Sequence, residues 1–384
     1  IPEDIPGGRE LKRDIVAFYE RHGFRLYPNA FSHYWNTEDS LANLLNGTLS
    51  PMMHADVAVD RTFRMLRNHW FDKLSGRGYR IDVVQSSYLS FCATHDVDRC
   101  MTYAVNSVGA LRREPGVKRS NSVASILQSY LERRAMFHFF SPLYEDKIRP
   151  AAASAAGLEL PGWNWDHLVF GPVTSRQLLA DMAETIGERP GGTALFAHLI
   201  LPHNTYLYDA RCETNPDFLK WVDRNRTVFW PFISNTPEDR AQRYVRYFDQ
   251  LRCTYRMLDA LFDAMRASGK FDRAMIFVHG DHGSRIALTD PLPQLADRLT
   301  SQDVIDSYST LYAVRIPGAG ASLSTETRSI QDLFAEHALG EPRRTAFRRV
   351  FLVSLPKWRL QPLDIYANEF DLEREQGGQH ASQR

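Results

Sequence analysis

The stretch Ala274-Met-Ile-Phe-Val-His-Gly-Asp-His-Gly-Ser-Arg285 decides the fold. Its first five residues form a short apolar run that is typical of a buried strand. A glycine-flanked turn carrying Asp281 and His282 follows directly. Open α/β sheets bind ligands just beyond the carboxyl ends of their strands. A carboxylate and an imidazole at such a place can hold one divalent metal ion. The alternative is a capping Asp beside a surface His.

A second apolar run, Thr193 to Leu201, leads directly into Pro202-His203-Asn204. This run also predicts a strand, so His203 follows a strand end as Asp281 and His282 do. Carboxyl ends of parallel strands meet at one edge of a sheet, and we therefore expect these side chains to lie close together. The pair of strand ends favours a functional site over an ordinary turn.

Helical spacing of apolar residues alternates with short apolar strands along the chain. This alternation predicts an α/β fold, a doubly wound and mostly parallel sheet with helices on both faces. The predicted helices are Arg9–His22, Glu38–Leu45, Arg61–Leu74, Ser175–Ile186 and Glu238–Ser268.

Asn36 and Thr37 directly precede the predicted helix Glu38–Leu45. Either residue is a good helix N-cap, which is the simpler interpretation. The functional alternative makes Thr37 a nucleophile, placed where free backbone N–H groups stabilise a phosphate or sulfate oxyanion. Coordination to a metal ion held by Asp281 and His282 would activate its hydroxyl.

Three segments resemble, in order and spacing, the sulfatase-like hydrolase and transferase branch of the alkaline phosphatase superfamily. They are Phe31–Gly47, Leu201–Asn204 and Ile276–Arg285, and the later run Tyr308–Pro317 is similar to the family strand after the metal turn. The resemblance covers most of residues 9 to 320. It implies an alkaline phosphatase-like fold and a metal-dependent enzyme acting on a phosphate or sulfate ester that is lipid- or glycan-linked.

The resemblance also implies a role for each matching residue. Thr37 would be the nucleophile, forming a phosphothreonine, and would bind the metal together with Asp281 and His282. His203 would bind substrate or a second metal ion, and the substrate-binding set would also include Arg285 and Asn36. The implied cofactor is one or two divalent ions, Mn²⁺ or Zn²⁺.

Two departures from the family pattern matter. Sulfatases of this superfamily carry Cys or Ser in a Cys/Ser-x-Pro-x-Arg stretch, whereas this chain has Thr37 at the matching position. A threonine at this position resembles the pattern of phosphoglycerol and phosphoethanolamine transferases and of phosphodiesterases. A sulfuric ester hydrolase is therefore the weaker alternative. The family also begins with an apolar strand ending in an acidic metal ligand, and we expect both to lie upstream of Ile1. An incomplete site keeps a non-catalytic binding domain as the rival hypothesis.

Composition and charge limit the class of protein. The 384 residues carry 46 Lys+Arg and 46 Asp+Glu, which excludes a globally basic nucleic-acid binder and predicts no nucleic-acid partner. The longest apolar runs are too short to span a bilayer. The chain starts with Ile1 rather than Met, so we expect a processed piece of a longer protein, anchored in a membrane through an upstream segment.

Four cysteines allow three disulfide pairings. The even count fits two disulfides in an oxidising compartment, although free thiols in a cytosolic protein look the same in sequence. Because transferases of the resembled branch act outside the cytoplasm, we expect a periplasmic or cell-surface location. We expect a catalytic domain over residues 1–320 with an insertion or cap at 105–165, followed by an extension and tail at 321–384.

Overall fold

The computed structural model describes residues 1–50, 64–86, 88–92, 97–103, 166–204, 206–215, 235–342, 347–354 and 359–365. The insertion expected at 105–165 lies outside these residues, as does the tail after residue 365. The α-helices are α1 (Gly8–Arg21), α2 (Thr37–Asn46), α3 (His69–Gly76), α7 (Asp166–Thr185), α9 (Pro237–Ala267), α10 (Ser301–Tyr308) and α11 (Ile330–Phe334). Short turns of 3-10 or π-helix are η3 (Ile186–Glu188), η4 (Phe271–Arg273), η5 (Pro293–Arg298) and η6 (Ala335–Leu339).

The strands form three separate sheets. They are β1 (Arg25–Phe31), β2 (Arg80–Ser86), β3 (Arg99–Tyr103), β4 (Thr193–His198), β5 (Ile276–His279), β6 (Ser309–Arg315), β7 (Ser322–Leu323), β8 (Arg328–Ser329), β9 (Arg349–Ser354) and β10 (Arg359–Asp364). One sheet has the order β3-β2-β4 and is entirely parallel. A second has the order β5-β6-β1-β7, with β8 also paired to β1. The third is the antiparallel hairpin β9–β10.

The expectation of one mostly parallel sheet is only partly correct. In the second sheet, β6 runs antiparallel to both β1 and β5, while β7 and β8 are parallel to β1. The sheet is therefore mixed, and the described strands fall into separate pieces. Short buried strands show their burial in sequence but not their direction or their neighbours, which is why the prediction overstated the parallel content.

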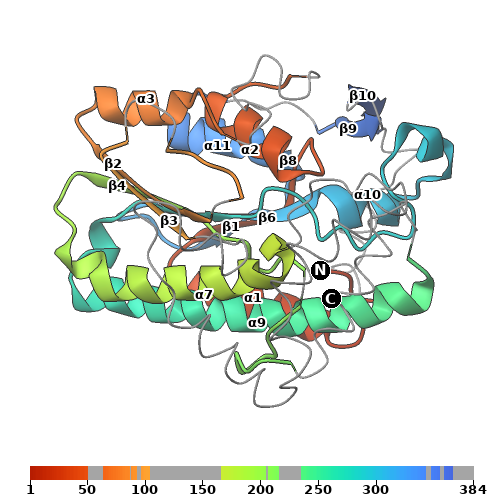
Figure 1. The fold of residues 1–384 in the computed structure, drawn as a ribbon, viewed down its shortest axis with the longest axis horizontal. Helices are drawn as coiled ribbons and strands as arrows, with labels where there is room; N and C mark the ends of the chain where they lie inside the picture. Colours follow the sequence, from red (N-terminus) through yellow and green to blue (C-terminus); the bar gives the residue numbers. More distant parts are fainter. Residues whose placement is uncertain are drawn as a thin grey trace, which may run out of the picture.

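Helices cover both faces of these sheets, as the sequence predicts (Figure 1). Helices α2, α3 and α11 lie on one face, and α1, α7 and α9 lie on the other. Two apolar clusters match these layers, the first built around Leu44, Phe71 and Leu333 and the second around Tyr19 and Phe262. This arrangement sets the carboxyl ends of β4 and β5 and the start of α2 around one region.

Helix boundaries follow local signals where those signals are strong. Helix α2 ends at Gly47, whose φ of 63° lies in the left-handed region that glycine adopts readily. The helix predicted over Arg61–Leu74 is wrong at its start, because α3 begins only at His69. Asn68 caps it, accepting a hydrogen bond from the Phe71 backbone N–H at 3.1 Å. An asparagine cap at this point competes with continuation of the helix toward the N-terminus.

Two disulfides join Cys92 to Cys100 and Cys212 to Cys253. They agree with the pair of disulfides expected from the even cysteine count. In the described part of the chain, no helix is both long and apolar enough to cross a membrane. Beyond residue 320, β7 and β8 pair with β1 and thus extend the same sheet.

Candidate active site

Thr37 is the first residue of α2 and is buried. The preceding Asn36 has extended backbone, as an N-cap does, but among the described residues its side chain makes no capping hydrogen bond. The Asn36 amide instead donates to Glu38 Oε2 at 3.1 Å and to Asp39 Oδ2 at 2.8 Å. The backbone N–H groups of the first turn are therefore not capped by Asn36, and the positive end of the helix lies beside Thr37.

The turn after β5 brings the predicted metal ligands beside Thr37. His282 Nδ1 donates to the Gly283 carbonyl at 2.8 Å, which leaves the lone pair on Nε2. That Nε2 lies 3.4 Å from Thr37 Oγ1 and 3.5 Å from Asp281 Oδ2. Segments about 245 residues apart in sequence thus meet at one point, as the two motifs predict.

Close backbone packing explains the glycine after His282. A Cβ atom on Gly283 would lie 2.5 Å from the Asp306 carbonyl oxygen, closer than real Cβ contacts allow. The Gly283 N–H donates to the Ser307 carbonyl at 3.0 Å. From the other side, the Ser40 hydroxyl of α2 donates to the Asp281 carbonyl at 2.5 Å. The turn is therefore fixed both to α2 and to the end of α10.

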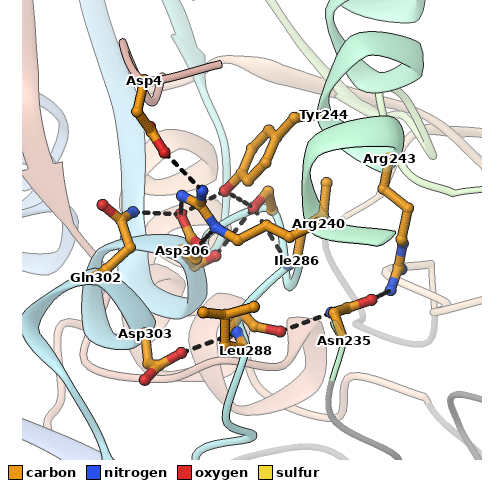
Figure 2. A network of polar contacts seen from close by, with 12 residues as sticks. Asp4, Asn235, Arg240, Arg243, Tyr244, Ile286, Leu288, Gln302, Asp303 and Asp306 are labelled. Atoms are coloured by element: carbon orange, nitrogen blue, oxygen red, sulfur yellow. Dashed lines mark hydrogen bonds and ion pairs between the residues drawn. The ribbon is translucent and has the colours of Figure 1, made fainter. Parts of the chain in front are cut away.

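A buried polar network surrounds Asp306 (Figure 2). Asp306 accepts hydrogen bonds from Arg240 Nε at 2.7 Å, the Tyr244 hydroxyl at 2.5 Å and Gln302 Nε2 at 2.8 Å. Tyr244 also hydrogen-bonds the Ser284 hydroxyl at 2.7 Å. Because Ser284 directly follows the turn that carries Asp281 and His282, this network holds that turn in place.

The pKa of Asp281 suits a metal ligand. Burial raises this pKa, but the nearby His282, a hydrogen bond from Thr37 and the nearby His198 lower it more, to about 2. Asp281 is therefore ionised at neutral pH, and its carboxylate can bind a cation.

The donor atoms of Asp281, His282 and Thr37 are of the type that a divalent metal ion binds, but they are fewer than the four ligands that such an ion usually takes. A carboxylate, an imidazole nitrogen and a hydroxyl are donors that Zn²⁺ and Mn²⁺ accept. Among the residues described, no three His, Cys, Asp or Glu side chains gather into a metal-binding group. In the described part of the chain, Asp281, His282 and the Thr37 hydroxyl are the candidate donors at this point.

The predicted substrate-binding residues divide into two groups. His203 and Arg285 line the same cavity of about 1360 Å³ as Thr37, Asp281 and His282. The His203 carbonyl accepts from Gln250 of α9 at 2.6 Å, and the Arg285 guanidinium lies 5.0 Å from the centre of the Trp35 ring. Asn36 is not among the residues that line the cavity, and its amide is held by two carboxylates.

Comparison with known proteins bears on the fold of the chain. No protein-family model matches the sequence, and no curated protein matches it. Among solved structures, the chain is similar to the phosphonate monoester hydrolase of Agrobacterium radiobacter, with a TM-score of 0.53 and 11% identity over 94% of this chain and 85% of that one. The chain therefore has the same fold as that hydrolase. Lower scores relate it to the periplasmic domain of EptC from Escherichia coli (TM-score 0.47, 10% identity, 96% and 90% covered) and to an alkaline phosphatase superfamily protein from Vibrio parahaemolyticus (0.45, 10%, 97% and 79%).

Two further histidines lie at strand ends beside the cavity, and the sequence motifs identified neither of them. His198 ends β4 and His279 ends β5, and both line the cavity. Burial lowers the pKa of His198 to about 4, although Asp281 and Glu38 raise it. Burial also lowers the pKa of His279. Both imidazoles are therefore neutral at pH 7. Their positions as the last residues of apolar strands are the signal that could have identified them.

Tyr88 and Glu38 form a second pair that sequence reasoning missed. The Tyr88 hydroxyl donates a hydrogen bond to Glu38 Oε1, and Tyr88 lines the cavity. Burial, reinforced by the Glu38 carboxylate, raises the pKa of Tyr88 well above its usual value. Tyr88 therefore stays protonated and holds Glu38, the residue after Thr37, in place.

Proposed function

We propose that this chain is the catalytic domain of a metal-dependent enzyme that cleaves or transfers phosphate esters through Thr37. The meeting of Thr37 Oγ1 with Asp281 and His282 Nε2 at the start of α2 carries the proposal. The fold supports it, because the similar Agrobacterium protein is named a phosphonate monoester hydrolase. Fold likeness alone does not assign an activity, so the argument depends on the site.

The proposed reaction has two steps. In the first, the Thr37 oxygen attacks phosphorus, the Oγ–P bond forms, and the P–O bond to the leaving alcohol breaks. The hydroxyl proton of Thr37 leaves with the departing alkoxide, so the products are an alcohol and a phosphothreonine, which keeps the second ester group when the substrate is a diester. In the second step, water or an acceptor alcohol takes the phosphoryl group and restores Thr37. Water makes the enzyme a hydrolase, and an alcohol makes it a transferase.

The surrounding groups suit the negative charge of the transferring phosphate. The N–H groups at the start of α2 and the Arg285 guanidinium can hold its non-bridging oxygens. His203 lies on the wall of the same cavity and is the proposed contact to the remaining part of the substrate. The chemistry selects an anionic ester, and lipid- or glycan-linked phosphate esters are the substrate class we propose.

Asp281, His282 and Thr37 would hold the divalent ion, Mn²⁺ or Zn²⁺. A bound divalent ion supplies charge that lowers the pKa of a nearby hydroxyl and stabilises the developing charge on phosphorus. A further acidic ligand, expected upstream of Ile1, would complete the set. The two disulfides support an extracytoplasmic location, which we propose for the domain together with a membrane anchor upstream.

Turnover of a chromogenic phosphodiester tests this function. We expect turnover by the protein to require Mn²⁺ or Zn²⁺ and to be lost in Thr37→Ala. Thr37→Ser should retain part of the activity because it keeps a hydroxyl. Thr48→Ala is the matched control, since Thr48 lies at the opposite end of α2 and hydrogen-bonds Asn43.

Three outcomes separate the alternatives. Faster turnover of a chromogenic sulfate ester than of the phosphodiester would identify a sulfuric ester hydrolase instead. Turnover that survives Thr37→Ala would exclude the phosphothreonine route. Absence of both turnover and calorimetric binding of Mn²⁺ or Zn²⁺ would overturn the enzyme proposal in favour of the non-catalytic binding domain.

A further inference from the structure

A buried carboxylate lies directly beside the proposed nucleophile. Glu38 follows Thr37 in the first turn of α2 and is only 6% exposed. Its Oε1 accepts a hydrogen bond from the Tyr88 hydroxyl, and its Oε2 accepts one from the Asn36 amide at 3.1 Å. Both donors are neutral groups. Within the ranges that the structure describes, Glu38 forms no ion pair with a Lys, Arg or His side chain.

Two other buried carboxylates of the chain are treated differently, because each is paired with a guanidinium group. Asp82 contacts Arg189, and Asp306 contacts Arg240. A buried charge without an opposite charge is costly, so folded proteins normally pair it. The positive end of α2 compensates the Glu38 carboxylate only in part, since a helix N-terminus is equivalent to about half an elementary charge. The negative charge of Glu38 therefore remains partly uncompensated.

This charge acts on the cavity that holds Thr37. Tyr88, Thr37 and Arg285 line the cavity, whereas Glu38 is not among the lining residues. Two cavity residues respond to the carboxylate, because Glu38 raises the pKa of Tyr88 and opposes the lowering of the pKa of His198. Tyr88 donates its only hydroxyl proton to Glu38, so its oxygen has only lone pairs for further contacts. An anion beside Thr37 therefore meets repulsion from Glu38 and gains no hydrogen bond from Tyr88.

We propose that Glu38, held by Tyr88, is a specificity-determining residue that discriminates between phosphate esters by their charge. The inference rests on the proposed function, since it concerns the ester that Thr37 attacks. A phosphate monoester carries two negative charges well above its second pKa of about 6, whereas a diester carries one. Repulsion between charges inside a protein is stronger than in water and is screened less by salt. Glu38 thus disfavours the second charge of a monoester and acts through its field, without touching the reacting atoms.

Calorimetric binding of two matched esters tests this role without turnover. Phenyl phosphate carries two charges at pH 8 and methyl phenyl phosphate carries one. Their affinities are compared with and without Glu38→Gln, in the presence of Mn²⁺ and in the Thr37→Ala background, so that neither ester is consumed. Glutamine has the shape of glutamate and accepts the same hydrogen bond from Tyr88, so the substitution removes the charge alone. We expect the affinity for the monoester relative to the diester to rise at least about tenfold in Glu38→Gln.

Two control variants separate the charge from the local structure. Tyr88→Phe breaks the same hydrogen bond but keeps the carboxylate, so the affinity ratio should stay close to that of the parent. Glu184→Gln removes the same formal charge from an exposed position near the end of α7, and it should also leave the ratio unchanged. If Tyr88→Phe raises the ratio as much as Glu38→Gln does, the hydrogen bond rather than the charge sets the preference, and the assignment is wrong.

The outcomes distinguish this inference from the proposed function. Binding of both esters with an unchanged affinity ratio in Glu38→Gln would overturn the role of Glu38 and leave the proposed reaction standing. The expected change of ratio, together with absence of turnover when Thr37 is present, would overturn the reaction alone. Binding of neither ester, with or without Glu38→Gln, would overturn both this inference and the proposed class of substrate.

Discussion

Replacing Asp306 by Ala leaves a buried guanidinium without its main partner. The side chains of Asp306 and Arg240 are 1% and 6% exposed, and their closest atoms lie 2.7 Å apart. Breaking one partner of a buried ion pair costs about 3–5 kcal/mol, since the other charge remains desolvated. In the variant, Arg240 keeps a second carboxylate partner, Asp4, at 3.0 Å, and the Asp4 side chain is 62% exposed. Because this contact compensates the guanidinium charge in part, we expect a loss of unfolding free energy at the lower end of that range, about 3 kcal/mol. Urea unfolding at pH 7 measures this loss.

Two controls make the magnitude informative. Asp272 and Arg315 form an ion pair of similar length, 2.8 Å, but Asp272 is 87% exposed, and Asp272→Ala should cost less than about 1 kcal/mol. Burial raises the pKa of Asp306 even though Arg240 and Tyr244 lower it, because desolvation disfavours the buried carboxylate, and replacing a buried ion pair by apolar side chains of similar volume is often neutral or stabilising. The double variant Arg240→Met, Asp306→Leu should therefore recover most of the loss. An Asp306→Ala cost no larger than that of Asp272→Ala would refute this reasoning.

Two further predictions concern pH and the disulfides. In the folded protein the pKa of His198 is lowered to about 4, whereas in the unfolded chain a histidine has a pKa of about 6.5. Between these two pH values the unfolded chain binds a proton at His198 and the folded protein does not. The free energy of unfolding should therefore drop by about 3 kcal/mol as the pH falls from 7 to 4. His198→Asn should flatten that part of the pH profile measured by urea unfolding, and an unchanged slope would contradict the burial of the imidazole. Removing Cys212–Cys253, with a sequence separation of 41, should cost about 4 kcal/mol, and removing Cys92–Cys100, with a separation of 8, about 2.5 kcal/mol on the chain-entropy estimate. Equal losses on thermal or urea unfolding of the two double Cys→Ser variants would contradict that entropic ordering.

The sequence predicted well those features that depend on local pattern. Apolar spacing located α1 and α2, and Gly47 marked the end of α2. The strand-then-turn pattern located Asp281 and His282, and the structure places them beside Thr37. These predictions succeeded because the signal for each lies within a few consecutive residues.

Other features depend on contacts that no local pattern encodes. Strand β6 runs antiparallel to β1 and β5, and short apolar strands carry no mark of direction in their sequence. The late start of α3 depends on the Asn68 cap, which a helical pattern alone overruns. The place of His198 beside the cavity depends on where β4 ends in the fold, which the sequence around His198 does not encode. The even number of cysteines predicted two disulfides, but the sequence left three pairings open, and only the fold shows which cysteines are joined.

The most direct test of the Thr37 chemistry is mass spectrometry of the enzyme quenched in acid during turnover of a phosphodiester with Mn²⁺. The account predicts that the peptide containing Thr37 carries a phosphoryl group that still bears the second ester group of the diester. This adduct should be absent from Thr37→Ala and should sit on the serine hydroxyl in Thr37→Ser. Metal-dependent turnover that leaves Thr37 unmodified at every quench time, or that modifies a different residue, would contradict it.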